Sequence, residues 1–419
     1  MPTIEVKFSK TKKKLKIKEK NFLGNLTPNK MTIDLINKME VKRALDHPIS
    51  SKKLSELVSA NEKVVIITSD ITRPMPSNVV LPLVIERLKS GGVKAEDIEI
   101  ILALGSHRSH TLEEKKYIVG EDIYNSQIKI TDSDMNNCVR LGMCNNGTPV
   151  DIFKPVVEAD RVICLGNIDY HYFAGYSGGI KAIMPGVSSW EAIQANHSNM
   201  VKKESYAGNL ETNPVRLDID QVSEFIKVDF LVNVILDEKK NIVKAVAGDI
   251  IKAHRQGCQH LDKLYGVTIN EKADIVITSP GGFPKDINLY QSQKALDNSK
   301  HAVKKGGIII LVASAKEGFG EEHFEKWMIN KSPDEMIRDI EDNFILGGHK
   351  AAAIARILKR NQIFFVSDLD DVLVKKIGFK PFKSVNVAIE KSIKALGKDA
   401  QIYVIPTGGS VLPINRNSN

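Results

Sequence analysis

Cysteine is scarce in this chain of 419 residues, which contains only four, and no two of them form a C-x-x-C pair. Cys138, Cys144, Cys164 and Cys258 are therefore not spaced for a zinc knuckle, and they are too few for the disulfide framework of a small secreted domain. Reduced thiols of this kind are typical of a cytoplasmic protein, which is the location that we expect.

Long apolar runs are also missing. No stretch approaches the roughly 20 apolar residues that a membrane-spanning helix requires, and residues 1–20 lack the apolar core of a signal peptide. The contents of 42% hydrophobic and 6% aromatic residues nevertheless lie in the range of folded, soluble proteins. Because 419 residues exceed what one hydrophobic core usually supports, we expect two domains and no membrane partner.

The glycine signatures of the common nucleotide-binding enzymes are absent too. The sequence contains neither the dinucleotide fingerprint G-x-G-x-x-G nor the phosphate-binding loop G-x-x-x-x-G-K-[ST]. A nicotinamide-dependent hydroxy-acid dehydrogenase is therefore weakened as an interpretation, although an α/β pattern of strands and helices would suit it.

The net charge of +8 comes almost entirely from one segment. Residues 7–20 contain eight lysines against the single acidic residue Glu19. Val6, Phe8, Leu15 and Ile17 alternate with these lysines at the period of a β-strand, which predicts a hairpin with one solvated face. Because the rest of the chain is close to neutral, we do not expect a nucleic-acid partner.

Short β-branched runs alternate with longer amphipathic segments from residue 60 onward, which is the pattern of an α/β fold. We expect strands at 63–69, 98–104, 161–165, 273–279, 307–313, 362–367 and 400–405, with helices at 78–90, 251–265 and 291–304. The polar stretch at 268–272 marks a boundary. We predict two domains, each a sheet flanked by helices: an N-terminal catalytic and cofactor-binding domain over 1–268 and a C-terminal α/β domain over 269–406, with the tail 407–419 returning to the first.

Loops that follow strands in such sheets are the usual places for ligands. Arg73 follows the first strand and suits a substrate carboxylate, with Asp70 placed to orient it, although a structural Asp–Arg pair is an equally good interpretation. His107 follows the next strand and has the chemistry of an acid or base near neutral pH, although a lone loop histidine is often incidental. His110 is the weaker candidate because it lies further along the loop.

The segment from His171 to His197 is the richest in chemical groups. Ser177, Gly178 and Gly179 offer backbone N–H groups for an anion, and Lys181 is a potential nucleophile or countercharge. The two histidines are too far apart in sequence for a helical zinc pair, so a metal bound to either one needs further ligands from elsewhere.

The second domain adds Gln291 and Lys294, which share a helix face and could hold a carboxylate or hydroxyl group, although a plain solvated helix start also fits. Residues 347–350, Gly-Gly-His-Lys, open another helix and could line the same cleft between the domains.

Five motifs together resemble the nickel-dependent lactate racemase family over nearly the whole chain. They are D-I-T-R-P at 70–74, S-H-R at 106–108, H-Y-F-A-G-Y-S-G-G-I-K at 171–181, A-N-H-S at 195–198 and L-Y-Q-S-Q-K-A at 289–295. The 171–198 block is the most specific of them. The resemblance implies an isomerase, a racemase or epimerase of a small 2-hydroxy acid, with its active site in the cleft between the two domains and the second domain closing over the substrate.

The resemblance also implies a cofactor and a set of roles. The cofactor is a nickel-pincer nucleotide, pyridinium-3,5-bisthiocarboxylic acid mononucleotide, attached to Lys181, with His197 as the protein ligand of nickel. His107 and His171 match the pair that exchanges protons with the substrate while hydride moves to and from the cofactor. Arg73, Tyr290, Gln291 and Lys294 match substrate-binding positions, and Asp70 accompanies them. Cofactor-synthesis proteins are the partners implied for loading.

One departure and one alternative accompany this resemblance. Family members that act on lactate can place a tryptophan over the substrate, where this chain has Gly347 and Gly348, so we expect a preference for acids bulkier or more polar than lactate. A binding protein that only carries the nickel cofactor is the non-enzymatic alternative, and the presence of both His107 and His171 argues against it.

Overall fold

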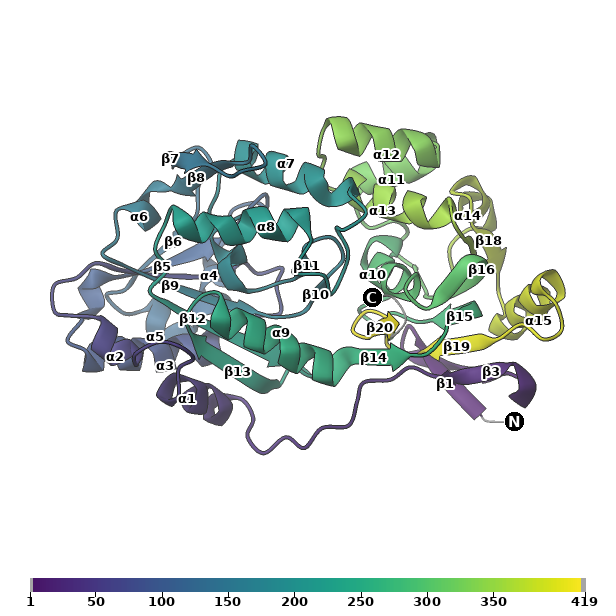
Figure 1. Ribbon diagram of the computed structural model, residues 1–419, viewed down its shortest axis with the longest axis horizontal. Helices are drawn as coiled ribbons and strands as arrows, with labels where there is room; N and C mark the ends of the chain where they lie inside the picture. The colour runs from purple at the N-terminus through teal and green to yellow at the C-terminus, as the bar shows by residue number, and fades with distance from the viewer. Residues whose placement is uncertain (1–2, 416–419) are drawn as a thin grey trace. The chain divides into compact units, whose positions relative to one another are not determined.

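The structure, a computed structural model, describes residues 3–415 and divides them into two compact units (Figure 1). We call residues 31–261 the central unit and residues 3–30 together with 262–415 the terminal unit. Each unit contains a six-stranded sheet and several helices. None of the helices in residues 3–415 combines the length and the apolar composition needed to cross a bilayer. No disulfide joins the cysteines of these residues.

The sheet of the central unit has the strand order β13-β12-β9-β4-β5-β6. Its strands are β4 (Val64–Ser69), β5 (Ile98–Ala103), β6 (Lys129–Asp132), β9 (Arg161–Asn167), β12 (Phe230–Leu236) and β13 (Ile242–Gly248). Every neighbouring pair is parallel except the edge pair β12–β13. Parallel strands buried on both faces need nearly continuous apolar sequence, which the fully buried stretch Val64–Thr68 of β4 illustrates.

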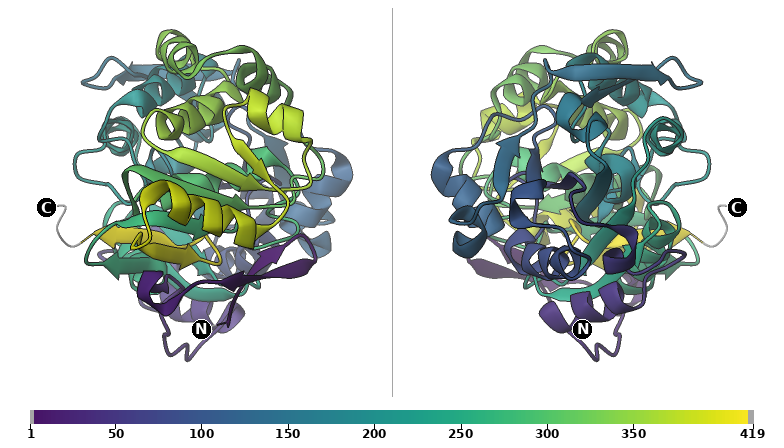
Figure 2. Two further views of the ribbon diagram at one scale, coloured as in Figure 1. Left: turned by 90° about the vertical axis from the view of Figure 1, so that its right-hand side faces the viewer. Right: turned by 90° about the vertical axis from the view of Figure 1, so that its left-hand side faces the viewer.

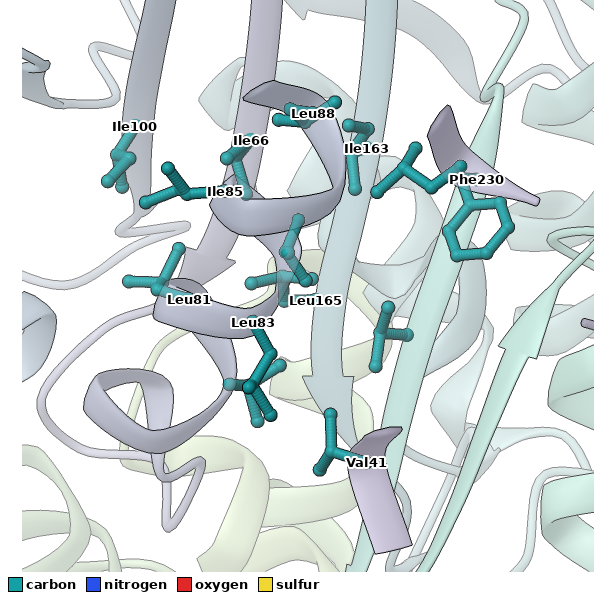
Figure 3. Close-up of a cluster of buried hydrophobic side chains, with 14 of the residues drawn as sticks. Val41, Ile66, Leu81, Leu83, Ile85, Leu88, Ile100, Ile163, Leu165 and Phe230 are labelled. Atoms are coloured by element: carbon teal, nitrogen blue, oxygen red, sulfur yellow. The ribbon is translucent and has the colours of Figure 1, made fainter. Parts of the chain in front are cut away.

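Helices cover this sheet and supply half of its core. They are α1 (Lys38–Asp46), α2 (Leu54–Leu57), α3 (Ser77–Ser90), α4 (Leu112–Val119), α5 (Glu121–Tyr124), α6 (Lys154–Val157), α7 (Trp190–Ser198), α8 (Pro214–Gln221) and α9 (Lys252–Tyr265). Figure 3 shows Leu81, Ile85 and Leu88 of α3 turned toward Ile66 and Ile163 of the strands. This packing confirms that the helix expected at 78–90 lies against the strands expected at 63–69 and 161–165. A small antiparallel pair, β7 (Cys138–Met143) and β8 (Pro149–Phe153), completes the unit's larger elements.

The strand order creates a switch point between β4 and β9. The chain runs from β4 outward to β5 and β6, and it then returns to the other side of β4 as β9. Loops on the two sides of such a point diverge and leave room for a ligand beyond the carboxyl ends of the strands. The segments that begin at Asp70 and at Ile168 leave the sheet at this position.

The terminal unit contains an all-parallel sheet of order β18-β17-β16-β15-β19-β3. Its strands are β3 (Phe22–Asn25), β15 (Ala273–Thr278), β16 (Val303–Val312), β17 (Gln362–Val366), β18 (Lys380–Phe382) and β19 (Ile402–Ile405). Its helices are α10 (Leu289–Ser299), α11 (Glu322–Asn330), α12 (Pro333–Asp342), α13 (Gly348–Leu358), α14 (Asp371–Lys376) and α15 (Val385–Leu396). The short parallel pair β14 (Gly266–Ile269) and β20 (Leu412–Asn415) belongs to the same unit.

The lysine-rich segment forms the predicted hairpin, β1 (Thr3–Phe8) paired with β2 (Thr11–Lys16). Its apolar residues Val6, Leu15 and Ile17 are buried in one cluster with Ile275 and Ile308 of the sheet. Figure 2 shows the purple hairpin and the yellow α15 on the same side of this sheet. The hairpin therefore has one solvated face of lysines and one face that is core.

The division into units differs from the expected domains in two respects. Residues 3–30 belong with the C-terminal part of the chain, because β3 pairs with β19 and the hairpin fills that core. The described part of the tail, through β20, pairs with β14 of the terminal unit rather than with the central one; residues 416–419 lie outside the described part. The unit boundary falls within α9, before the polar stretch that suggested it.

The expected strands and helices are otherwise confirmed within a few residues, with one larger difference. The helix expected at 291–304 ends at Ser299, and the following strand begins at Val303 instead of 307. The β-branched Val303 pairs with Ala273 at the start of β15, which draws the chain into the sheet early.

We expect Ile17→Ala to lower the free energy of unfolding of the terminal unit by about 2–5 kcal/mol, because Ile17 is fully buried in its core. The two tryptophans report the units separately, since Trp327 lies in the terminal unit and Trp190 in the central one. Urea unfolding followed by Trp327 fluorescence in a Trp190→Phe background measures the effect. Ile414→Ala, at an exposed position of the terminal unit, is the matched control. An equal effect of both substitutions would show that the hairpin is not core.

Candidate active site

The ring of Phe173 brings three of the predicted residues together in the central unit. His171 packs edge-on against it with ring centroids 4.5 Å apart, and His197 does so at 5.0 Å. The ammonium nitrogen of Lys181 lies 5.9 Å from the same ring centroid. His171 comes from β10 (Tyr170–His171), Lys181 from a 3₁₀ turn (Gly179–Ala182) and His197 from the last turn of α7. Residues distant in sequence thus share one small region.

Arg216 holds the loop that carries these residues. Its side chain has no solvent exposure, and it donates to the carbonyl oxygens of Ala174 and Tyr176. Its guanidinium also lies 3.5 Å from the carboxylate of Asp220. The amide of Asn213 adds a hydrogen bond of 2.8 Å to the carbonyl of Phe173. Buried carbonyls that the loop cannot satisfy itself therefore find donors on α8 and at its start.

Close packing against His254 explains why position 179 of this loop is a glycine. Gly179 has a φ of +62°, and a Cβ atom there would lie 2.7 Å from Cγ of His254. The His254 ring accepts a hydrogen bond from Arg255 at Nδ1, so its Nε2–H donates to the carbonyl of Ser177 at 2.9 Å. A buried neutral imidazole from α9 therefore supports the turn that presents Lys181.

The proposed use of this loop as an anion cradle is wrong for two of its three amides. The N–H of Ser177 donates to the carbonyl of Asp169 at 2.8 Å, and the N–H of Gly179 donates to Oδ1 of Asn233 at 2.7 Å. The Ser177 hydroxyl also donates to the carbonyl of Asn167 at 2.8 Å. These groups maintain the loop's own shape, while a cofactor contact by Gly178 stays a prediction.

Burial and neighbouring cationic side chains lower the pKa values of two of the site's groups. Burial and the charges of Arg216 and Arg73 keep the pKa of the Lys181 amine well below its usual range. Burial, together with Lys181 and Arg73, likewise keeps the pKa of His171 well below that of an ordinary histidine. A lowered pKa favours the neutral, nucleophilic form of an amine. Nδ1 of His171 accepts from the backbone N–H of Ala174 at 3.3 Å, so the proton of the neutral ring lies on Nε2.

The loops after β4 and β5 form the second part of the site. Nδ1 of His107 lies 2.8 Å from Oδ2 of Asp70, and the hydroxyl of Thr72 donates to the same oxygen at 2.8 Å. Burial opposes ionisation of Asp70, but the hydrogen bond from His107 and the charge of Arg73 outweigh it and lower the pKa of its carboxyl. The carboxylate therefore accepts from Nδ1–H and leaves Nε2 of His107 as the reactive nitrogen.

Arg73 keeps a looser contact with the same carboxylate. Its Nε lies 3.8 Å from Oδ1 of Asp70, and 55% of its side chain is exposed. A guanidinium that is oriented but not saturated can still bind an incoming carboxylate with two parallel hydrogen bonds. The structure thus brings Asp70, Arg73 and His107 together, as the sequence predicted.

The remaining predicted residues lie on α10 of the terminal unit. Asn288 caps this helix by accepting from the N–H of Gln291, and Gln291 is exposed while Lys294 is half-buried. The Tyr290 ring packs against Phe324 at 5.5 Å and beneath the ammonium of Lys350 at 3.7 Å. Gln291 and Lys294 therefore share an accessible helix face, as their spacing predicted.

The open space expected at Gly347 and Gly348 is not present. A Cβ atom on Gly347 would lie 1.8 Å from the carboxylate of Glu321, and one on Gly348 would lie 2.9 Å from the ring of Trp327. His349 is buried, and its Nδ1 accepts from the N–H of Gly347 at 3.0 Å. The two glycines allow close packing within the terminal unit, so the expectation of a larger pocket was wrong.

Comparison with known proteins agrees with this arrangement of residues. The family model of the lactate racemase N-terminal domain matches residues 8–208, and that of the lactate racemase C-terminal domain matches residues 268–413. The lactate racemase of Thermoanaerobacterium thermosaccharolyticum is 36% identical over 98% of this chain and 99% of its own length. That of Lactiplantibacillus plantarum is 35% identical over 98% of this chain and 100% of its own length. The chain belongs to the lactate racemase family.

Solved structures give the same result. The lactate racemase apoprotein from T. thermosaccharolyticum matches with a TM-score of 0.90 at 34% identity, over 99% of this chain and 100% of that one. A Thermotoga maritima protein matches with a TM-score of 0.62 over 91% of this chain and 99% of that one, and its 16% identity shows the fold alone. Membership in the lactate racemase family makes the chain an isomerase, so the dehydrogenase interpretation is not retained.

Several residues of this lactate racemase family site were not found from the sequence. Phe173, Arg216, Asn233 and His254 act through buried contacts and carry no distinctive spacing. The one sequence signal for His254 is its position on α9, because it shares the buried face of this helix with Cys258 and Leu261, where an apolar residue would be expected. Buried supports of this kind depend on tertiary packing, which sequence patterns do not encode locally.

We expect Gly179→Ala to lower the free energy of unfolding of the central unit by about 1–3 kcal/mol more than Gly147→Ala does. Both positions have positive φ, but a Cβ on Gly147 meets nothing within 4 Å, whereas one on Gly179 meets the His254 ring. The difference therefore isolates the steric contact from the backbone strain. Urea unfolding followed by Trp190 fluorescence measures it, and equal losses in the two variants would contradict the role of His254 as a support.

Lowering the pH should also lower the free energy of unfolding of the central unit, because of His254. Burial and the charge of Arg216 keep its pKa well below the unfolded value of about 6.5, so the unfolded chain binds the extra proton first as the pH falls. This single site should cost on the order of 1 kcal/mol of stability between pH 7.5 and pH 5.5. His254→Gln, whose amide can still donate to Ser177, should reduce the pH dependence by that amount. His47→Gln, at an exposed position, is the control, and an unchanged pH dependence in His254→Gln would contradict the assignment.

Proposed function

We propose that the protein racemises lactate, or another small 2-hydroxy acid, by proton-coupled hydride transfer on a nickel-pincer nucleotide attached to Lys181. The observation that carries this proposal is the gathering of His171, Lys181 and His197 around Phe173, next to the Asp70–His107 pair, in a chain of the lactate racemase family.

The residues present fit the proposed cofactor. Burial and the charges of Arg216 and Arg73 lower the pKa of the Lys181 amine, which favours the neutral form that can bond to a carboxyl-derived arm. His197 offers an imidazole, a suitable ligand for nickel. Within residues 3–415 no group of three or more His, Cys, Asp or Glu side chains is arranged to hold a metal, and the proposal requires only one protein ligand. When bound, the cofactor would accept and return the hydride of the substrate carbon.

Arg73 is the proposed anchor of the substrate carboxylate. Its guanidinium is exposed and oriented by Asp70, so it can bind a carboxylate in a bidentate manner. Gln291 and Lys294, with Tyr290, are proposed to contact the substrate. Their shared face on α10 supports this assignment.

His107 and His171 are the proposed proton-transfer groups. Inversion at a carbon requires that the hydroxyl proton can be taken and returned when the substrate presents either face, so two groups are needed. Asp70 fixes the tautomer of His107 and directs Nε2 outward. Nδ1 of His171 accepts from the backbone N–H of Ala174, which leaves Nε2 as the nitrogen proposed to exchange a proton with the substrate.

Lactate is the proposed substrate because the argument for larger acids has lost its structural basis. The glycines at 347 and 348 are packed against Glu321 and Trp327 and provide no additional room. Both curated relatives described above are lactate racemases. We further propose that cofactor-synthesis proteins load the enzyme. We also propose that it works in the cytoplasm, where the thiols of the described residues, which form no disulfide, would stay reduced.

Two classes of variant should separate cofactor retention from turnover. Lys181→Ala and His197→Ala should lose racemisation together with the covalent mass adduct or the nickel, because they remove the attachment point and the metal ligand. His107→Ala and His171→Ala should keep adduct and nickel but lose turnover by about 10²-fold or more. Intact-mass spectrometry, nickel analysis and circular dichroism of single-enantiomer lactate measure the three quantities.

His47→Ala provides the control, since it removes an exposed histidine outside the site. A full adduct on Lys181→Ala protein would refute the attachment. Normal turnover in both His107→Ala and His171→Ala would leave the carrier interpretation as the better one.

A further inference from the structure

His110 is a second histidine in the loop after β5, and the proposed reaction does not use it. Only 1% of its side chain is exposed. Its Nδ1 lies 2.7 Å from Oδ1 of Asp132, and its Nε2 lies 3.1 Å from the backbone nitrogen of Ile71. Both ring nitrogens are therefore occupied inside the central unit, so His110 has no nitrogen left to exchange a proton with a substrate.

The contact with Ile71 completes the hydrogen bonding of the turn that carries Arg73. The N–H of Arg73 donates to the carbonyl of Asp70 at 3.1 Å, which closes a β-turn over 70–73. The N–H of Thr72 donates to the Asp70 carboxylate at 3.3 Å. The N–H of Ile71 points away from both of these acceptors, and His110 receives it. Each backbone donor of the turn thus has its own acceptor.

The direction of each hydrogen bond fixes the form of the His110 ring. A backbone N–H can only donate, so Nε2 of His110 is an acceptor and Nδ1 carries the proton, which it donates to Asp132. Asp132 ends β6 and also accepts from the backbone N–H of His110 and from Lys115, both at 3.1 Å. The ring is therefore anchored to the neighbouring strand of the sheet.

We propose that His110 is a positioning residue that holds the Asp70–Arg73 turn in place for substrate binding. This inference rests on the proposed function of Arg73 and His107. Two histidines three residues apart link the β5 loop to adjacent residues of the β4 loop: His107 binds the Asp70 carboxylate, and His110 binds the Ile71 amide. The first link orients the proton-transfer group, and the second fixes the backbone from which Arg73 projects.

Asparagine and glutamine at position 110 provide a matched pair of tests. The amide of His110→Asn reaches about as far as Nδ1, so it can keep the contact with Asp132 but cannot reach Ile71. The amide oxygen of His110→Gln reaches about as far as Nε2 and can accept from Ile71. Amide hydrogen exchange at Ile71, and the KM and kcat for lactate of the cofactor-loaded enzyme, are the measurements.

We expect His110→Asn to speed amide exchange at Ile71 about tenfold and to raise KM about tenfold, with a smaller change in kcat. This is the effect of leaving one backbone donor without its acceptor. His110→Gln should stay close to the wild type in both. A residue that merely stabilises the fold would not distinguish the two variants. Equal exchange and equal KM in both variants would therefore overturn the proposal.

Asp132→Asn keeps the test open if His110→Asn does not fold. This variant weakens the hydrogen bond to Nδ1 of His110 but leaves Nε2 in place. It should therefore speed amide exchange at Ile71 without abolishing protection. Unchanged exchange would count against the proposal. Lack of lactate racemisation by the loaded wild-type enzyme would refute the proposed function instead, while the Ile71 exchange rates would still decide whether His110 fixes the turn.

Discussion

The candidate site depends on one buried cation, the guanidinium of Arg216. A charge without solvent contact is stable only when surrounding groups replace its water, and here the carbonyls of Ala174 and Tyr176 and the carboxylate of Asp220 do so. The loop that carries His171 and Lys181 must keep its shape for these carbonyls to face inward. Burial lowers the pKa of Lys181, and the charge of Arg216 lowers it further, so Arg216 affects both the geometry and the electrostatics of the site.

The histidines of the central unit show how neighbours decide what an imidazole can do. His107 shares Nδ1 with an ionised carboxylate and keeps Nε2 for chemistry, whereas His110 and His254 use both nitrogens on protein groups and act as supports. Burial lowers the pKa of His171, and nearby cationic side chains lower it further. The residue type alone did not separate these roles. The hydrogen-bond partners do, because a nitrogen already engaged in a buried bond cannot take part in proton transfer.

Much of the fold and part of the site could be predicted from the sequence. Parallel strands such as β4 are recognised from short β-branched runs. The rule that ligands bind beyond the carboxyl ends of such strands singled out Asp70, Arg73 and His107 as candidate site residues. The hairpin of residues 3–16 was recognised, but its place in the terminal unit was not, because pairing of β3 with β19 joins segments at opposite ends of the chain. The larger pocket expected at Gly347 and Gly348 was wrong for a related reason. The space next to these glycines is filled by Glu321 and Trp327, which are distant in sequence.

Two different constraints therefore support the two halves of the site in the central unit. The turn after β4 is fixed by the parallel register of β4, β5 and β6, which places Asp70, His107 and Asp132 at the ends of adjacent strands. The His171–Lys181 loop contains the two-residue strands β10 and β11 (Gly175–Tyr176) and a 3₁₀ turn, and contacts from Arg216, Asn213 and His254 hold it on its buried side. The proposed substrate anchor Arg73 is thus positioned by the sheet, whereas the proposed attachment point Lys181 is positioned by side-chain packing. Substitutions beneath the second loop should accordingly affect cofactor retention before they affect the affinity for substrate.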